Sequence, residues 1–107
     1  MNEPMKTYPV QRRYARVACN AAAVVTLGEH TTAGICDSLS VGGAFFKGEA
    51  APPSAPIKLV LCLPSMGPIE VHGEVCYSRE DGFGIRFTQL PPTALRAICT
   101  YVGSTLH

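Results

Sequence analysis

The stretch IEVHGEVCYSREDGFGIRF, from Ile69 to Phe87, decides the expected fold of this 107-residue chain. Apolar and polar residues alternate through its first ten positions, the period-two pattern of a strand with one buried face. EDG at Glu80–Gly82 is a hairpin turn signal, and FGIRF then resumes the alternation. The stretch therefore predicts an antiparallel hairpin. The side chains expected to face inward are Ile69, Val71, Val75, Tyr77, Phe83, Ile85 and Phe87.

The preceding segments carry the same kind of pattern. Apolar residues fall on one face of Val17–Leu27, and His30–Cys36 reads as the returning strand after a Gly-Glu turn. A short apolar strand follows the two glycines at 42–43, and Ile57–Leu63 alternates after a proline-rich loop. We count about six antiparallel strands with short connections. A six-stranded antiparallel β-barrel is the expected fold, because closure removes exposed strand edges.

The end of the chain has a different period. Pro92 suits the first turn of a helix, and Gly103 suits its C-terminal end. The spacing between them is i, i+3, i+4 and i+7, which predicts one apolar helix face packed on the barrel. The residues on that face are Leu95, Ile98, Cys99 and Val102. The expected fold class is therefore mainly β, with one C-terminal α-helix.

Composition narrows the possible partners and locations. The net charge is +1, so general attraction to DNA or RNA is not expected. The N-terminus lacks the apolar core of a signal peptide, and the longest apolar run is interrupted by Lys58 and too short for membrane insertion. We expect a cytoplasmic protein with a flexible N-terminal arm over residues 1–10 and one barrel domain over residues 11–107.

Neither a metal site nor an enzyme is indicated. The five cysteines include no C-x-x-C pair, so we expect small, buried, reduced thiols. A zinc site would require ligands that converge without a sequence signature. The chain has no phosphate-binding loop and no dinucleotide fingerprint, so no catalytic residue and no cofactor is predicted.

Two stretches are candidates for ligand binding. The first, QRRYARV at Gln11–Val17, carries Arg12, Arg13 and Arg16. Arginine binds phosphate oxygens or guanine O6 and N7 through a planar fork, and it stacks on base faces. Taken alone, this cluster is also compatible with a solubilising arm.

The second stretch is DSLSVGG, from Asp37 to Gly43. It is compatible with a plain hairpin turn, but glycines also permit close backbone approach and leave N–H groups to face an anion. Since the arginines precede the first strand and this turn follows the second, the two stretches are expected to lie side by side. Together they predict one anionic-ligand site. Its candidate residues are Arg12, Arg13, Arg16, Asp37, Ser38, Ser40, Gly42 and Gly43.

These motifs carry a family resemblance. The spacing R-x-x-x-R at Arg12 and Arg16, followed by [DN]-x-S-x-x-G at Ser40 and Gly43, resembles the signature of the PilZ domain, a bacterial receptor for cyclic di-GMP. The position of the family's Asp or Asn holds Ser38, and the acid, Asp37, stands one place earlier. In a regular hairpin these two side chains point to opposite faces, whereas a β-bulge would bring Asp37 back.

The resemblance extends through GEVCYSREDGFGIRF and the helix, over about residues 11–103. It implies the same six-stranded barrel with a C-terminal helix. It also implies that cyclic di-GMP lies between the arginine arm and the turn, and that ordering of the arm signals to an unidentified effector protein.

Two alternatives stay open. One is a PilZ-fold interaction module that does not bind cyclic di-GMP, which the absence of an acid at position 38 favours. The other is a small barrel for single-stranded nucleic acid, which needs exposed aromatic side chains along a basic groove. The alternation disfavours the second alternative because it places Phe45, Phe83 and Phe87 inward.

Overall fold

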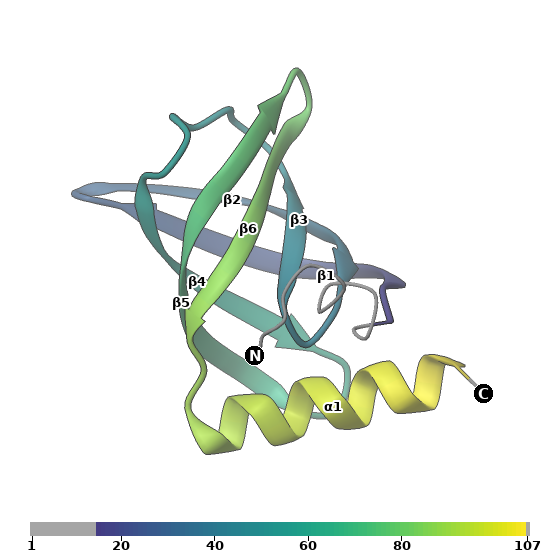
Figure 1. Ribbon diagram of the computed structural model, residues 1–107. Coiled ribbons are helices and arrows are strands. Elements are labelled where there is room, and N and C mark those ends of the chain that lie inside the picture. The colour runs from purple at the N-terminus through teal and green to yellow at the C-terminus, as the bar shows by residue number, and fades with distance from the viewer. Residues whose placement is uncertain (1–14, 107) are drawn as a thin grey trace, which may run out of the picture.

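The computed structural model describes residues 15–106, and it contains six strands and one helix (Figure 1). The expected arm over residues 1–10, together with Arg12 and Arg13, lies outside the described residues. The elements are β1 (Val17–Leu27), β2 (His30–Leu39), β3 (Gly43–Lys47), β4 (Pro56–Leu63), β5 (Gly67–Arg79), β6 (Gly82–Gln89) and α1 (Pro92–Leu106).

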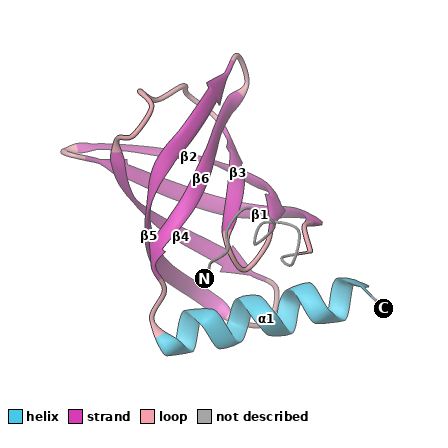
Figure 2. Cartoon of the chain, in the orientation of Figure 1, coloured by secondary structure: helices cyan, strands magenta, loops and turns pink. Residues whose placement is uncertain are grey.

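The six strands close into a barrel in the order β1-β2-β3-β6-β5-β4, and every neighbouring pair is antiparallel. Figure 2 shows the strands wrapping around one axis, with the helix across one end. Tight turns make this closure possible. The β1–β2 turn, for example, uses Gly28 at φ 62°, a left-handed conformation that glycine adopts without steric cost. The predicted barrel with a C-terminal helix is confirmed.

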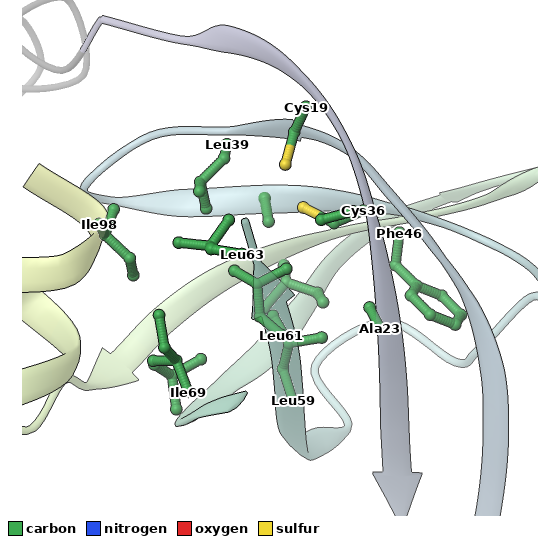
Figure 3. Packing of buried hydrophobic residues seen from close by; sticks show 14 of the residues in the cluster. Cys19, Ala23, Cys36, Leu39, Phe46, Leu59, Leu61, Leu63, Ile69 and Ile98 are labelled. Carbon is green, nitrogen blue, oxygen red and sulfur yellow. The ribbon is translucent and has the colours of Figure 1, made fainter. Parts of the chain in front are cut away.

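The barrel is filled by the inward-facing side chains of every strand (Figure 3). Phe46 of β3 and Phe83 of β6 pack with ring centroids 5.3 Å apart and are both fully buried. Burying a side chain of this kind contributes about 1.5–3 kcal/mol, so the inner wall supplies most of the fold's stability. The largest fully buried residues are Phe46, Phe83, Leu39, Leu59, Leu61, Ile98, Val25, Val71, Val75 and Cys36.

Helix α1 covers the end of the barrel where β1 begins and β2 ends (Figure 1). Its buried stripe is Ala94, Ile98 and Val102, and Ile98 points into the barrel in Figure 3. The prediction that Ile98 and Val102 face the barrel is confirmed, and the prediction for Leu95 and Cys99 was wrong, because Leu95 is 39% exposed and Cys99 is also exposed.

A small and a long side chain together determine which face of α1 packs on the barrel. Ala94 lets the helix approach the barrel closely, and the Tyr101 hydroxyl reaches the Ala18 carbonyl at 3.5 Å. Gly103 does not end the helix, because it keeps a helical backbone and the helix runs on to Leu106. Within the described residues, no helix combines the length and apolarity needed to cross a membrane.

Irregularities in the strands decide which side chains face outward. In β5 the register with β6 shifts between Val75 and Tyr77, so Cys76 is an extra residue. This bulge reverses the alternation, and Tyr77 is 46% exposed on the outside of the barrel. The prediction that Tyr77 faces inward was wrong for this reason. Phe87, also expected inside, is half-buried against the core.

All five cysteines are free thiols, and only Cys19 and Cys36 are buried. The expectation of five buried thiols was wrong for three of them. Cys62 occupies an outward position between Leu61 and Leu63, Cys76 is the bulged residue of β5, and Cys99 lies on the outer helix face. Within residues 15–106, no three His, Cys, Asp or Glu side chains gather as potential metal ligands.

Candidate functional site

The two predicted stretches meet at the helix-covered end of the barrel. Arg16 immediately precedes β1, and Ser38 lies near the end of β2, where Ala18 is its partner in the ladder. The Arg16 guanidinium donates a hydrogen bond from Nη1 to Ser38 Oγ at 2.9 Å. The antiparallel pairing of β1 with β2 therefore brings Arg16 next to Ser38, as the order of the two stretches along the chain predicts.

A β-bulge in β2 sets the directions of Asp37 and Ser38. Cys36 pairs with Phe46 and Ser38 pairs with Phe45, so Asp37 is the extra residue between them. Both Asp37 and Ser38 consequently face outward, while Cys36 and Leu39 on either side are buried. The regular hairpin, in which these two side chains would point to opposite faces, is not present.

Asp37 has a cationic neighbour on the next strand. Its Oδ1 lies 3.9 Å from Nζ of Lys47, and both side chains are about half exposed, at 52% and 49%. A pair with this exposure is screened by water and contributes little to stability. The Asp37 carboxylate is therefore accessible to a ligand on the outer face.

Ser40 holds the turn between β2 and β3. It is 4% exposed, its backbone N–H donates to the Gly43 carbonyl at 2.8 Å, and its hydroxyl donates to the same carbonyl at 3.3 Å. The N–H groups of Gly42 and Gly43 each donate to Ser40 Oγ at 3.2 Å. The expectation that these two N–H groups are free to face an anion was wrong, because Ser40 already accepts them.

The two glycines dock the turn onto β6. A Cβ at Gly43 would lie 2.2 Å from the Ile85 carbonyl oxygen, so only glycine fits there. The Gly42 carbonyl accepts a hydrogen bond from the Phe87 N–H at 3.0 Å. Neither glycine has a positive φ, so their role is close approach between strands rather than an unusual conformation.

An aromatic pair adjoins Ser38, and sequence reasoning missed it. The register places Ser38 beside Phe45, Phe45 beside Gly84, and Gly84 beside Tyr77, in one outward-facing row across β2, β3, β6 and β5. The rings of Phe45 and Tyr77 stack with centroids 6.1 Å apart and an interplanar angle of 23°. We call these two rings the aromatic platform.

The sequence of β3 alone predicts that one aromatic ring faces outward. Phe45 and Phe46 are consecutive, so a strand must turn one ring outward. Phe45 was expected inside, and it is only 3% exposed, but it lies on the outer face and not in the core cluster. Tyr77 and Arg79 cover it there.

Three arginines surround this outer face. Arg86 on β6 is neutralised by Glu74 on β5, with Nη2 and Oε1 2.9 Å apart. Within residues 15–106, no carboxylate forms an ion pair with Arg16 or Arg79.

The inner wall below Ser38 is neutral. Burial raises the pKa of the Cys36 thiol, and the neighbouring Cys19 raises it further. The protonated thiol donates to the Ser38 carbonyl at 3.3 Å, which supports the bulge from inside. Figure 3 shows the Cys19 and Cys36 sulfur atoms pointing toward one another within the barrel.

Comparison with known families places these features in context. The sequence profile of the PilZ domain matches residues 10–104, nearly the whole chain. This chain belongs to the PilZ family. The matched range spans Arg12, Arg16, Ser40 and Gly43, on which the resemblance rests.

Solved structures share the fold at low sequence identity. The PilZ domain of YcgR from Escherichia coli, solved with c-di-GMP, superposes with a TM-score of 0.73 at 16% identity, covering 90% of this chain and 92% of that one. The PilZ domain of CeSA from a cellulose-synthesizing bacterium gives 0.69 at 14% identity, covering 87% and 99%. Among curated proteins, no sequence matches this chain.

The inhibitor of motility MotI/DgrA from Bacillus subtilis gives a TM-score of 0.70 at 15% identity, covering 88% of this chain. This chain spans about half (50%) of the length of that protein. At these identities the likeness shows that this chain and the three solved structures share a fold.

Proposed function

We propose that this PilZ protein is a receptor for cyclic di-GMP that binds the ligand on the outer face of β2 and β3 and signals through a partner protein. The observation that carries the proposal is the hydrogen bond from Arg16 to Ser38, because it joins the arginine motif to the turn motif. Family membership and the c-di-GMP held by the related YcgR domain support the choice of ligand.

Each group on this face has a role suited to its chemistry. Arg16, together with Arg12 and Arg13, supplies planar forks for phosphate oxygens and guanine edges. The Asp37 carboxylate can accept the adjacent N1–H and N2–H₂ donors of guanine. The exposed face of Tyr77 offers a stacking surface for a base. Ser40, Gly42 and Gly43 act indirectly in this proposal, because they hold the turn against β6.

Signalling in this proposal depends on the segment that precedes β1. When the ligand binds Arg12, Arg13 and Arg16 together, that segment is held in one arrangement and presents a new surface. A partner that recognises this surface reads the ligand concentration, which is an ordering switch. The barrel itself is a rigid support in this scheme, since its core is closed and fully packed.

Calorimetric titration with cyclic di-GMP tests the proposal, with cyclic di-AMP as the ligand control. Arg16→Ala removes about two charge-assisted hydrogen bonds of roughly 1.5–3 kcal/mol each, so affinity should fall by roughly two to four decades. Arg96→Ala is the charge-matched control, because Arg96 is an exposed arginine on α1 and belongs to neither of the two motif stretches. Its affinity should equal that of the parent protein.

A second pair of variants tests the acid. With the bulge present, Asp37→Asn removes a charged acceptor and should weaken binding by about one to two decades. Ser38→Asp places a second carboxylate beside Asp37 and should also weaken binding, through like-charge repulsion. Glu29→Gln, at the distant β1–β2 turn, is the control for loss of one negative charge.

The outcomes separate the alternatives. If the parent protein shows no heat of binding with cyclic di-GMP, the ligand-free interaction module becomes the better description. If the parent binds and Arg16→Ala binds equally well, the arginines form a solvated arm and the ligand occupies another surface.

A further inference from the structure

Arg79, at the end of β5, has an unusual position for a surface arginine. Its guanidinium carbon lies 4.4 Å from the centroid of the Phe45 ring and 5.8 Å from that of Tyr77. Within the described residues it forms no ion pair with a carboxylate. The contacts with the aromatic platform therefore help to fix where this guanidinium lies.

The platform under Arg79 is itself held in place. The Tyr77 ring lies against the backbone of Gly84, where a Cβ would come within 2.4 Å of the ring. Phe45 pairs with that same glycine on its other side and stacks on Tyr77. Because both rings are fixed against β6, the guanidinium that rests on Phe45 is held beside the exposed ring of Tyr77.

We propose that Arg79 is a base-stacking residue, whose guanidinium plane, backed by Phe45, receives a purine base of a nucleotide ligand. The proposal deepens the proposed function and rests on it for the choice of cyclic di-GMP. A guanidinium is planar and weakly hydrated, and it stacks on base faces as well as on aromatic rings. Lysine shares the charge but offers no plane.

The location suits this role. Phe45 is the ladder partner of Ser38, and Ser38 accepts the hydrogen bond from Arg16. A base on Arg79 would therefore lie on the same outer face as the groups proposed to bind phosphate and the guanine edge. Arg79 comes from β5 and is independent of the arginine cluster that precedes β1.

A simpler role for Arg79 makes different predictions. Long charged side chains often cover apolar surface with their methylene groups, and Arg79 could do only this for Phe45. In that case Arg79→Ala would lower the melting temperature, Arg79→Lys would restore most of it, and neither change would alter ligand affinity. Stability and affinity must therefore be measured on the same variants.

The test uses the full chain and its Arg79→Lys and Arg79→Ala variants, with Arg96→Lys as the control. In calorimetry with cyclic di-GMP, Arg79→Lys should lose about tenfold in affinity and Arg79→Ala about ten- to a hundredfold, as expected for loss of one stacked base. Arg96→Lys should bind like the parent. If Arg79→Lys and Arg79→Ala both bind like the parent, the proposal is wrong.

A spectroscopic measurement separates this proposal from the choice of ligand. The Arg79 Nε–H resonance should shift upfield when a purine stacks on the guanidinium, and it should respond to GMP but not to ribose 5-phosphate, each at millimolar concentration. If the parent does not bind cyclic di-GMP but GMP shifts this resonance, the proposed function fails and the stacking role stands. If GMP leaves it unmoved, the stacking role is rejected whatever cyclic di-GMP does.

Discussion

Phe45 and Phe46 are neighbours on β3 and are almost equally inaccessible, at 3% and 0% exposure, but for different reasons. Phe46 points into the barrel and packs on Phe83 in a closed core. Phe45 points outward, where the Tyr77 ring stacks on it and the Arg79 guanidinium lies over it. Phe46 is therefore enclosed by the closed barrel, whereas two side chains that contact Phe45 belong to the protein surface.

The same contrast runs along β2. Leu39 and Cys36 face the core and are fully buried, whereas Asp37 and Ser38 between them face outward with a charge and a hydroxyl. Neighbouring residues of one strand thus face opposite sides of the barrel, and inward side chains set stability while outward side chains are available for binding. Substitutions of such neighbours should therefore separate effects on stability from effects on ligand binding.

The largest difference is expected for the two phenylalanines. Phe46→Ala removes a core ring and leaves a cavity, so the free energy of unfolding should fall by about 3–5 kcal/mol. Phe45→Ala should cost only about 1–2 kcal/mol, because the site lies on the outer face, where water can enter the space that the ring leaves. Urea denaturation of both variants measures this. Equal losses would mean that the outer side of β3 is also core.

The two serines should differ in the same direction. Ser40→Ala removes the acceptor of the part-buried Gly42 N–H and the buried Gly43 N–H, and we expect a loss of about 1–3 kcal/mol in unfolding free energy. Ser38→Ala removes only an exposed contact with Arg16 and should change stability by less than about 0.5 kcal/mol. Thermal denaturation compares them. A larger loss for Ser38→Ala would contradict the division between the two serines.

A third test concerns how the aromatic platform is seated. Gly84→Ala places a methyl group against the Tyr77 ring, which must lift, so we expect a loss of about 1 kcal/mol. In a Tyr77→Ala background the same change should cost almost nothing, because the clash is gone. A double-mutant cycle of unfolding free energies measures this coupling. If Gly84→Ala is equally costly in both backgrounds, the glycine is needed for another reason.

The fold was largely predictable because its signal is local. Alternation in Ile57–Leu63 and Phe83–Phe87 fixes which side of each strand meets the core, and short glycine turns fix the antiparallel order. The strand bulges were not predictable, since an extra residue changes the register without an obvious change in composition. Tyr77 was therefore placed on the wrong face, and the direction of Asp37 stayed open.

The candidate site was only partly predictable for the same reason. Motif spacing indicates Arg16 and Ser38, and the structure brings them into contact. Motif spacing does not show that Ser40 Oγ accepts hydrogen bonds from the N–H groups of Gly42 and Gly43, because these bonds depend on the turn conformation. It also does not place Phe45 beside Tyr77, since their proximity depends on the β3-β6-β5 strand order rather than on sequence distance.

The smallest effect is expected for Cys36, on the inner side of the wall directly before Asp37. Burial raises the pKa of its thiol, so the folded protein keeps the proton at pH values where the unfolded chain, with a pKa near 8.5, loses it. Raising the pH therefore favours the unfolded state. The free energy of unfolding should be unaffected by this thiol below about pH 8 and should be lower by about 0.8 kcal/mol at pH 9. Burial also raises the pKa of Cys76, so Cys76→Ser should be the common background. Denaturation between pH 7 and 9.5 should show this decline in the background protein and its absence after Cys36→Ala. An unchanged decline in Cys36→Ala would assign the alkaline sensitivity to another group.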